Sequence, residues 1–272
     1  MFQCSLFSCL IILLALAPCA LVRAASMIDC LPQASVSQVT VAQIHDGDTV
    51  TLTDNKRVRF AGIDTPEIDH KVPSRNEPFA LQARSRLDQL IANQPVALAV
   101  DRRPYDRHGR TLGHLVNHQG KNINQQLLLE GYARLMVVGD NDLWRCYSVA
   151  EWLARRSKTG IWQQPELTPT PVADITSASK QWREYRGVVS KFVRNQNHSW
   201  WLLDNKLWVG GENQVIDQLT IPANSAVEGE DWIVRGVLYQ SYGKLRIRVN
   251  HSSQIIRTHE IEKWVDKVKP EA

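Results

Sequence analysis

Alternating apolar and polar residues between positions 39 and 67 predict two short strands joined by a polar turn. The first strand resumes at residues 49–52, and the second runs over residues 57–63. The Asp-Gly-Asp run at 46–48 has the side chains that favour a tight turn or a bulge. Pro66 ends the second strand, because it has no N–H for the ladder and restricts the residue before it.

The downstream pattern alternates between helical and strand-like segments. Apolar residues recur at helical spacing in three segments, 79–92, 122–130 and 142–158, and apolar runs typical of strands occupy 96–100 and 112–116. Short strands with inserted helices predict a fold that is mainly β, a five-stranded barrel of the OB type with packed helices. We assign this first domain to residues 26–162.

A second domain is predicted after a change in composition. Residues 163–180 are rich in Pro, Thr and Ser and are typical of a linker. Residues 181–260 contain short alternating strands without a sizeable helix, which predicts a second small β-barrel with an OB-like topology. Residues 261–272 form a short charged tail with helical character.

Six of the nine tryptophans fall in or beside this second barrel. They are Trp182, Trp200, Trp201, Trp208, Trp232 and Trp264, interleaved with Arg183, Arg186, Arg194, Arg235, Arg246 and Arg248. On one face these rings and guanidinium groups would form a stacking platform for single-stranded nucleic acid. The alternative, which we favour slightly, is that half of the tryptophans pack the barrel and the arginines are solvated.

Composition sets only broad limits. The chain has 272 residues, of which 43% are hydrophobic and 22% are charged, enough for one large or two small globular domains. The formal net charge of +4 permits a polyanionic partner and does not require one.

The N-terminal segment and the cysteines both indicate export. Residues 6–22 are an almost unbroken apolar run followed by small residues, which predicts a cleaved signal peptide over residues 1–25 and a periplasmic or secreted product. The remaining cysteines are Cys30 and Cys146, and in an oxidising compartment we expect them to form a disulfide. It would close a loop of about 115 residues and restrict the unfolded chain by ~4–5 kcal/mol. Two unrelated buried thiols are the alternative.

Candidate chemistry is concentrated at the ends of the first two strands. Asp48, Asp64 and Glu67 lie at predicted strand ends, and Arg57 and Arg59 lie on the second strand. Carboxylate oxygens are hard ligands that suit Ca²⁺ or Mg²⁺ rather than zinc. We expect Arg57 to lie on the solvent face.

The order of these residues resembles the thermonuclease (staphylococcal nuclease-like) family. The matching segments are D-G-D-T at 46–49 and R-x-x-x-x-D-T-P-E at 59–67. D-R-H-G-R at 106–110 and N-x-x-L-L-x-x-G-x-A at 124–133 continue the match, which covers residues 38–162. The resemblance implies the same OB-type barrel that the apolar pattern predicts.

The resemblance also implies a metal site. Its ligands would be Asp48, Asp64 and the backbone carbonyl of Thr65, holding Ca²⁺, with Mg²⁺ or another divalent cation as alternatives. So few protein ligands would leave open positions for water and for a phosphate oxygen.

Three further residues are implied as catalytic. Glu67 would act as the general base, and Arg59 and Arg110 would bind the nonbridging phosphate oxygens. Arg59 and Asp64 are five residues apart, so a regular strand would point them to opposite faces. We therefore predict a bulge or twist near Gly62 that brings both into one cleft.

The implied function is an exported, metal-dependent endonuclease, monomeric, that hydrolyses DNA and RNA. The resemblance implies a preference for single strands and products with 3′-phosphate and 5′-hydroxyl ends. Two positions depart from the family: His108 replaces a loop tyrosine, and the substrate-stacking tyrosines have no clear match around residues 136–139. The alternatives are an inactive, nuclease-derived module that binds nucleic acid or another polyanion, and an unrelated β-barrel enzyme or calcium-stabilised interaction domain.

Overall fold

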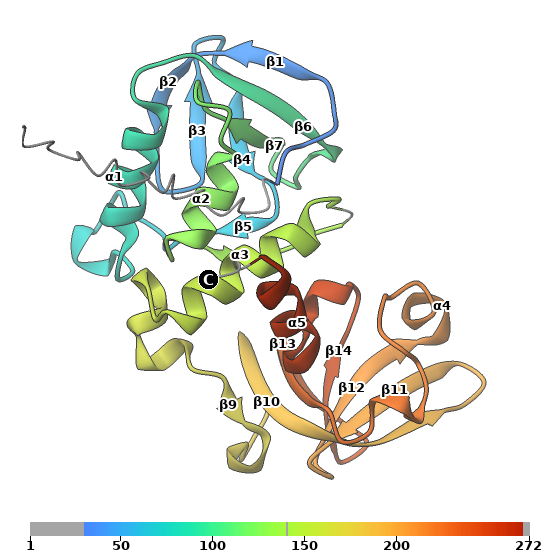
Figure 1. Cartoon of the computed structure of the whole chain (residues 1–272). Coiled ribbons are helices and arrows are strands. Elements are labelled where there is room, and N and C mark those ends of the chain that lie inside the picture. The colour runs from blue at the N-terminus through green and yellow to red at the C-terminus, as the bar shows by residue number, and fades with distance from the viewer. Residues whose placement is uncertain (1–29, 140, 269–272) are drawn as a thin grey trace, which may run out of the picture.

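The computed structural model describes residues 30–139 and 141–268, which form two β-barrels with helices packed between them (Figure 1). The predicted signal peptide, residues 1–25, lies outside the described residues. Among the helices that are described, none has the length and apolar character needed to cross a membrane.

The first barrel is a sheet whose two edges are joined by one stretch of chain. Its strands are β1 (Val36–Val39), β2 (Val41–Ile44), β3 (Thr49–Leu52), β4 (Arg57–Phe60), β6 (Val96–Tyr105) and β7 (Thr111–Val116). The order is β1-β6-β7-β4-β3-β2, and only Thr40 separates β1 from β2. The segment 36–44 therefore pairs with both edges and closes a five-stranded barrel, in which β4 and β7 are parallel. The predicted mainly β fold is confirmed.

Three helices cover this barrel at the predicted places. They are α1 (Ala80–Ile91), α2 (Ile123–Leu129) and α3 (Trp144–Arg156). The buried face of α1 carries Ala80, Ala83, Leu87, Leu90 and Ile91, the apolar stripe seen in the sequence. The side chain of Asn122 caps α2 by accepting from the backbone N–H of Gln125, and Gly131 follows the helix at φ +70°.

The second barrel has the same strand order as the first. Its strands are β9 (Thr170–Pro171), β10 (Ser179–Arg194), β11 (His198–Leu203), β12 (Leu207–Glu212), β13 (Asp231–Ser241), β14 (Lys244–Arg248) and β15 (Ile255–Arg257). The order is β15-β13-β14-β12-β11-β10-β9, and β10 also pairs with β13. The ring β10-β11-β12-β14-β13 is therefore closed, with β12 and β14 parallel, as β4 and β7 are in the first barrel. A short helix, α4 (Asn213–Ile216), follows β12.

The segment expected to be a linker is instead part of the second barrel. Residues 163–180 contain the short strand β9, which pairs in parallel with β10. Val172 and Ile175 are buried in the second hydrophobic core. These apolar side chains among Pro, Thr and Ser anchor the segment, so it does not act as a flexible spacer.

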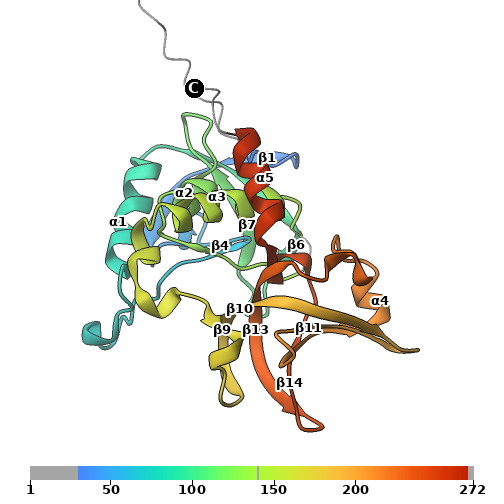
Figure 2. The same cartoon turned by 60° about the horizontal axis from the view of Figure 1, so that its bottom comes forward.

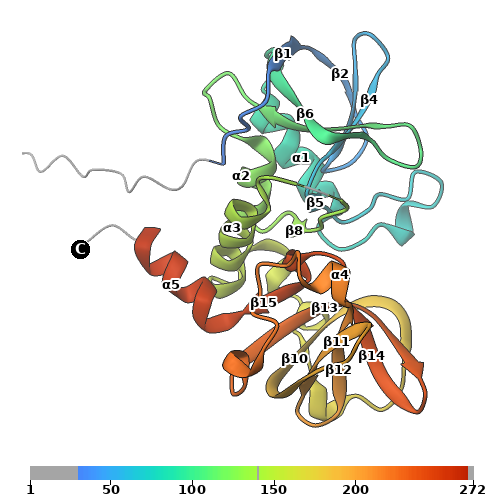
Figure 3. The ribbon, with the colours of Figure 1, turned by 90° about the vertical axis from the view of Figure 1, so that its right-hand side faces the viewer.

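The predicted charged tail is also packed. Helix α5 (Thr258–Val268) buries Ile261 and Val265, and Figure 3 shows it beside α3 at the boundary between the barrels. Trp152 Nε1 of α3 donates a hydrogen bond of 2.9 Å to Glu262 of α5.

Buried ion pairs join the two barrels. Arg235 on β13 pairs with Glu151 on α3, and its Nη1 donates to the carbonyl of Leu135 at 3.1 Å. Arg155 on α3 pairs with Glu184 on β10 at 2.5 Å. Arg235 is 3% exposed and Glu151 is 1% exposed, so this ion pair is buried between the two barrels and holds them against each other.

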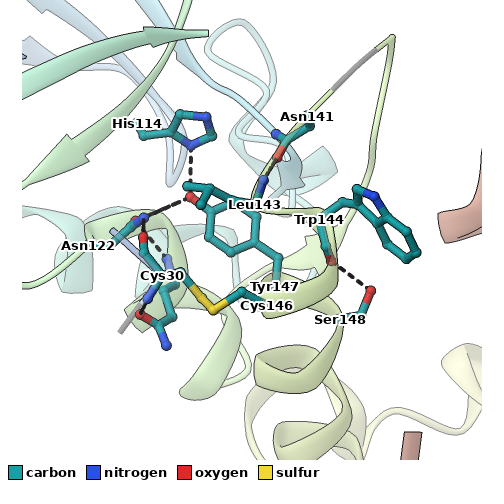
Figure 4. Close-up of a disulfide and its surroundings, with 10 residues drawn as sticks. Cys30, His114, Asn122, Asn141, Leu143, Trp144, Cys146, Tyr147 and Ser148 are labelled. Carbon is teal, nitrogen blue, oxygen red and sulfur yellow. Dashed lines mark hydrogen bonds between the residues drawn. A yellow bond between two sulfur atoms is a disulfide. The ribbon is translucent and has the colours of Figure 1, made fainter. Parts of the chain in front are cut away.

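The predicted disulfide between Cys30 and Cys146 is present, with 5.7 Å between the Cα atoms (Figure 4). It ties the beginning of the described chain to α3. Tyr147, the next residue on α3, accepts a hydrogen bond of 2.9 Å from Asn122 Nδ2 and lies 2.8 Å from His114 Nδ1. Burial raises the pKa of the Tyr147 hydroxyl above its ordinary value, so it stays protonated in this network.

Candidate active site

Asp48 is fully buried at the start of β3. Its Oδ2 accepts a hydrogen bond of 2.8 Å from the backbone N–H of Thr65, and its Oδ1 accepts from Thr49 Oγ1 at 3.1 Å. A Cβ at Gly47 would lie 2.7 Å from the Ala83 Cβ and 2.9 Å from the Thr65 Cβ. The turn before Asp48 therefore needs glycine, because α1 and the end of β5 (Ile63–Asp64) approach it closely.

Arg59 on β4 lies between two carboxylates. Its Nη2 donates to Asp64 Oδ1 at 2.7 Å, and its Nη1 pairs with Asp48 Oδ1. The strand breaks between β4 and β5, where Gly62 has a φ of +80°. The predicted irregularity near Gly62 is present as a break between two strands rather than as a bulge, and it places the Arg59 and Asp64 side chains on the same side.

The Arg59 guanidinium contacts both Asp48 and Asp64, so the two carboxylates lie on either side of this one positively charged side chain. The two side chains are 0% and 13% exposed. Thr65 is buried beside them, and its Oγ1 has no hydrogen-bond partner among the residues described. This donor set has the hard oxygen atoms that a divalent cation prefers.

No group of three or more His, Cys, Asp or Glu side chains is arranged to hold a metal within residues 30–139 and 141–268. A cation at this position would therefore use two carboxylates and backbone or water oxygens. Such a ligand set suits Ca²⁺ or Mg²⁺, which accept carbonyl and water ligands, and does not suit zinc.

Arg134 is absent from the residues predicted from the sequence, yet it contacts Asp64 directly. It lies on β8 (Arg134–Leu135), which pairs with β5 so that Arg134 and Asp64 are cross-strand partners. Its Nε and Nη2 donate to Asp64 Oδ2 at 2.9 and 2.7 Å. The only sequence signal is a basic residue directly after the G-x-A segment, 70 residues from Asp64.

Glu67 follows the Thr65-Pro66 corner and reaches solvent. Its pKa is raised above the ordinary value by desolvation and then by the nearby carboxylates of Asp46, Asp64 and Glu77, while Arg59 opposes the shift. A carboxylate with a raised pKa is a stronger proton acceptor, as a general base requires.

Asp46 stabilises the turn that precedes Asp48. Its Oδ1 accepts from the backbone N–H of Asp48 at 3.0 Å, and burial raises its pKa above the ordinary value despite the nearby Arg59. The sequence predicts only that Asp46 favours a turn. The hydrogen bond shows that it positions the Asp48 backbone.

Arg110 is held by the turn at residues 106–110. The Asp106 Oδ1 accepts from the backbone N–H groups of His108 and Arg110 at 2.8 and 3.0 Å, and its Oδ2 accepts from Arg110 Nε at 2.7 Å. Although burial opposes the shift, these hydrogen bonds lower the pKa of Asp106 below its ordinary value, so it stays ionised. Gly109, at φ +76°, lets this turn form.

Arg59 and Arg110 line one pocket of about 410 Å³, together with Gly62, Met136 and Asn141. The three carboxylates and Thr65 are not among the pocket's lining residues. Arg59 connects the two parts, because it forms part of the pocket wall while its guanidinium contacts Asp48 and Asp64. The structure thus places two arginine side chains at a pocket beside the buried Asp48 and the partly buried Asp64.

Comparison with known proteins assigns this barrel to a group of related nucleases. The model of the family described as staphylococcal nuclease homologue matches residues 57–164. A thermonuclease of Staphylococcus intermedius is 33% identical over 128 residues, covering 46% of this chain and 75% of the relative. An uncharacterized endonuclease of Escherichia coli O157:H7 is 27% identical over 132 residues, covering 47% of this chain and 79% of the relative. The endonuclease YncB of Bacillus subtilis is 30% identical over 138 residues, covering 48% of this chain and 64% of the relative. The family match ends at residue 164, so β10 to β15 lie outside it.

Proposed function

The chain belongs to the staphylococcal nuclease homologue family, and we propose that it is an exported, divalent-metal-dependent endonuclease that cleaves DNA and RNA. Hydrolysis of phosphodiester bonds follows from the family. The single observation that best supports a metal-dependent active site is the position of the Arg59 guanidinium. It bridges Asp48 and Asp64 at the wall of the pocket that Arg110 also lines.

The residues that would hold the cation are Asp48, Asp64 and the backbone carbonyl of Thr65. Ca²⁺ is the cation we propose first, and Mg²⁺ is the alternative. When bound, the ion would supply positive charge that makes a neighbouring water easier to deprotonate.

The side chains of the chain divide the remaining work. Arg59 and Arg110 bind the nonbridging oxygens of the scissile phosphate and stabilise the charge that grows on them in the transition state. Glu67 accepts a proton from the attacking water as the new bond between oxygen and phosphorus forms. The bond from phosphorus to the 5′ oxygen breaks, and that oxygen leaves with a proton from solvent, giving a 3′-phosphate and a 5′-hydroxyl.

The fixed position of Arg110 gives it a defined contribution to the rate. Asp106 holds the Nε, and no hydrogen bond from the two Nη nitrogens of Arg110 reaches another described residue. These nitrogens are the donors available to a phosphate. Removal of a donor aimed at the transition state costs about 3–4 kcal/mol, or roughly 10²–10³-fold in rate.

Export is supported by two features of the chain. Residues 6–22 have the apolar run of a secretory signal, and a disulfide such as that between Cys30 and Cys146 is typical of proteins in oxidising compartments. We propose a periplasmic or extracellular enzyme that acts on single strands in preference to duplexes, and as a monomer.

The test uses the purified protein with labelled single-stranded DNA, duplex DNA and RNA, in Ca²⁺, in Mg²⁺ and in EDTA. We expect cleavage with cation, faster on single strands, and no cleavage in EDTA. Arg110→Ala should lower the rate by about 10²–10³-fold, whereas Arg57→Ala, which removes an exposed arginine from β4, should leave it unchanged. Binding of nucleic acid without cleavage in every cation would refute the enzyme and favour a binding module.

A further inference from the structure

The outward face of the second barrel carries aromatic rings and cations side by side. Strand pairing places Trp200 of β11 opposite Gly210 of β12, and places Trp208 of β12 opposite Arg246 of β14. Tyr239 of β13 is the antiparallel partner of Arg246. Paired residues share a face of the sheet, so these side chains form one surface that spans four strands.

The rings and cations on this surface contact each other. The guanidinium of Arg246 lies 4.9 Å from the Trp200 ring centre and 6.0 Å from that of Tyr242. Lys244 and Lys191 lie 4.7 and 5.8 Å from the Trp208 ring centre. These distances are within the range of cation–π contacts, which orient the cations beside the rings.

Trp200 lies across the neighbouring strand. Its contact with Arg246 spans β12, which separates β11 from β14 in the sheet. At that level β12 carries Gly210, which has no side chain to block the indole. The absence of a side chain at Gly210 therefore leaves room for the Trp200 ring to contact Arg246 across β12.

The charge of this surface is strongly positive. Lys191, Lys244, Arg246 and Arg248 have no ion-pair partner among the described residues, and the one acidic side chain of the face is Glu212, opposite His198. Elsewhere on this barrel three arginines are paired, Arg186 with Asp231, Arg194 with Asp217 and Arg235 with Glu151, whereas Arg183 donates to the side-chain amide oxygen of Gln181. The surface thus carries, beside its aromatic rings, four cations that form no ion pair with a described residue.

The six tryptophans of the second half divide by their position in the barrel. Trp201 and Trp232 are fully buried and pack the core, so two of the six tryptophans do so, fewer than the half expected in the alternative considered from the sequence. Trp200 and Trp208 are half-buried on the outward face. Trp182, 43% exposed, lies on β10 opposite Val237 of β13, and Trp264, 50% exposed, lies on α5 outside this surface.

From this arrangement we propose that the outward face of β11, β12 and β14 binds single-stranded nucleic acid. Bases stack on Trp200, Trp208 and Tyr242, and the phosphates are held by the four unpaired cations. Base stacking on aromatic rings in a basic groove is how barrels of this topology grip single strands without sequence preference. The positions also agree with that topology: the two tryptophans lie on its second and third strands, and Tyr242, 93% exposed, lies in the loop between the fourth and fifth.

This inference rests on the proposed function, because it makes the second barrel a substrate-holding site for the nuclease barrel. Figure 2 shows the β13–β14 turn at the end of the second barrel away from the first barrel. A long strand could reach both sites, whereas a single phosphodiester could occupy only the catalytic pocket. Retention on the second barrel therefore lowers the KM for long substrates and leaves the chemistry of a small one unchanged.

Binding is measured by fluorescence anisotropy of a labelled oligothymidylate in EDTA, over 50 to 200 mM salt. Trp208→Ala should weaken binding roughly 5- to 150-fold, the range for loss of one stacked base. Lys244→Gln should reduce the slope of log affinity against log salt by about 0.7, the value for one phosphate contact on a single strand. The matched controls, Trp264→Ala and Arg186→Gln, remove an exposed ring and an exposed cation outside this surface and should bind as wild type.

Two further measurements decide the remaining cases. Hydrolysis of bis(p-nitrophenyl) phosphate in Ca²⁺ should be unchanged in Lys244→Gln, while the KM for long single-stranded RNA rises. If the wild type fails to hydrolyse either substrate, the proposed enzyme is wrong and the anisotropy result still decides the binding surface. Wild-type affinity in both Trp208→Ala and Lys244→Gln overturns the proposal. Heparin that competes with the labelled oligothymidylate as well as unlabelled oligothymidylate does, at matched charge, also overturns it, because the surface would then recognise charge alone.

Discussion

Replacing Arg235 with alanine should lower the free energy of unfolding by about 3 kcal/mol, and the reason lies in the contact between the barrels. Arg235 is 3% exposed and pairs with Glu151, which is 1% exposed, and with Glu184 at 3.0 Å. Breaking a buried pair by removing one partner costs about 3–5 kcal/mol, because the other charge stays buried. Arg155 lies 3.5 Å from Glu151 and 2.5 Å from Glu184, so part of the charge remains compensated. The lower end of the range is therefore expected.

The assay is urea denaturation followed by tryptophan fluorescence, with hydrogen exchange to locate the loss. Arg186→Ala provides the matched control, since it breaks a pair with Asp231 at the exposed surface and should cost no more than about 1 kcal/mol. Protection should fall in α3 and β13 in the Arg235→Ala protein. Equal effects of the two substitutions would refute the view that this ion cluster fixes the barrels together.

The remaining predictions concern the disulfide, the loss of stability at acid pH and the metal site. Cys30→Ser with Cys146→Ser should lower the free energy of unfolding by about 2–5 kcal/mol in urea denaturation, since the closed loop spans 116 residues. Although burial opposes the shift, Arg155 and Arg235 lower the pKa of Glu184, so its contribution to stability is complete above its ordinary pKa and is lost as the pH falls through the lowered value. Glu184→Gln should therefore reduce the fall in melting temperature over that acid range, and an unchanged pH profile would contradict the assignment. Arg134→Gln should bind Ca²⁺ more tightly in calorimetry, because the removed guanidinium competes for Asp64; equal or weaker binding would exclude that competition.

The elements and their order could be predicted from the sequence because they depend on local patterns. The three helices of the first barrel begin and end within two residues of their predicted positions, owing to clear apolar stripes and to caps at Asn122 and Gly131. Strand alternation also separates neighbours such as Trp200 and Trp201, of which one faces outward and the other is buried.

What could not be predicted depends on contacts between distant segments. Arg134 meets Asp64 only because β8 pairs with β5, and no local pattern records that pairing. Likewise, Val172 and Ile175 are isolated apolar residues in a Pro-rich segment, so their burial depends on the second core and not on any periodicity. The buried pair of Arg235 and Glu151 requires the barrels to be docked, which composition alone does not indicate.

The central claim is that the acids and arginines around Arg59 form a site that hydrolyses phosphodiesters with a bound divalent cation. Its most direct test is the initial rate of cleavage of a single-stranded oligonucleotide in Ca²⁺ by the wild type, Glu67→Gln and Asp54→Asn. Loss of the general base should lower the rate by about 10²–10⁴-fold with the fold intact, whereas Asp54→Asn, which removes an exposed carboxylate beyond β3, should cleave at the wild-type rate. A Glu67→Gln protein that cleaves as fast as the wild type would contradict the account.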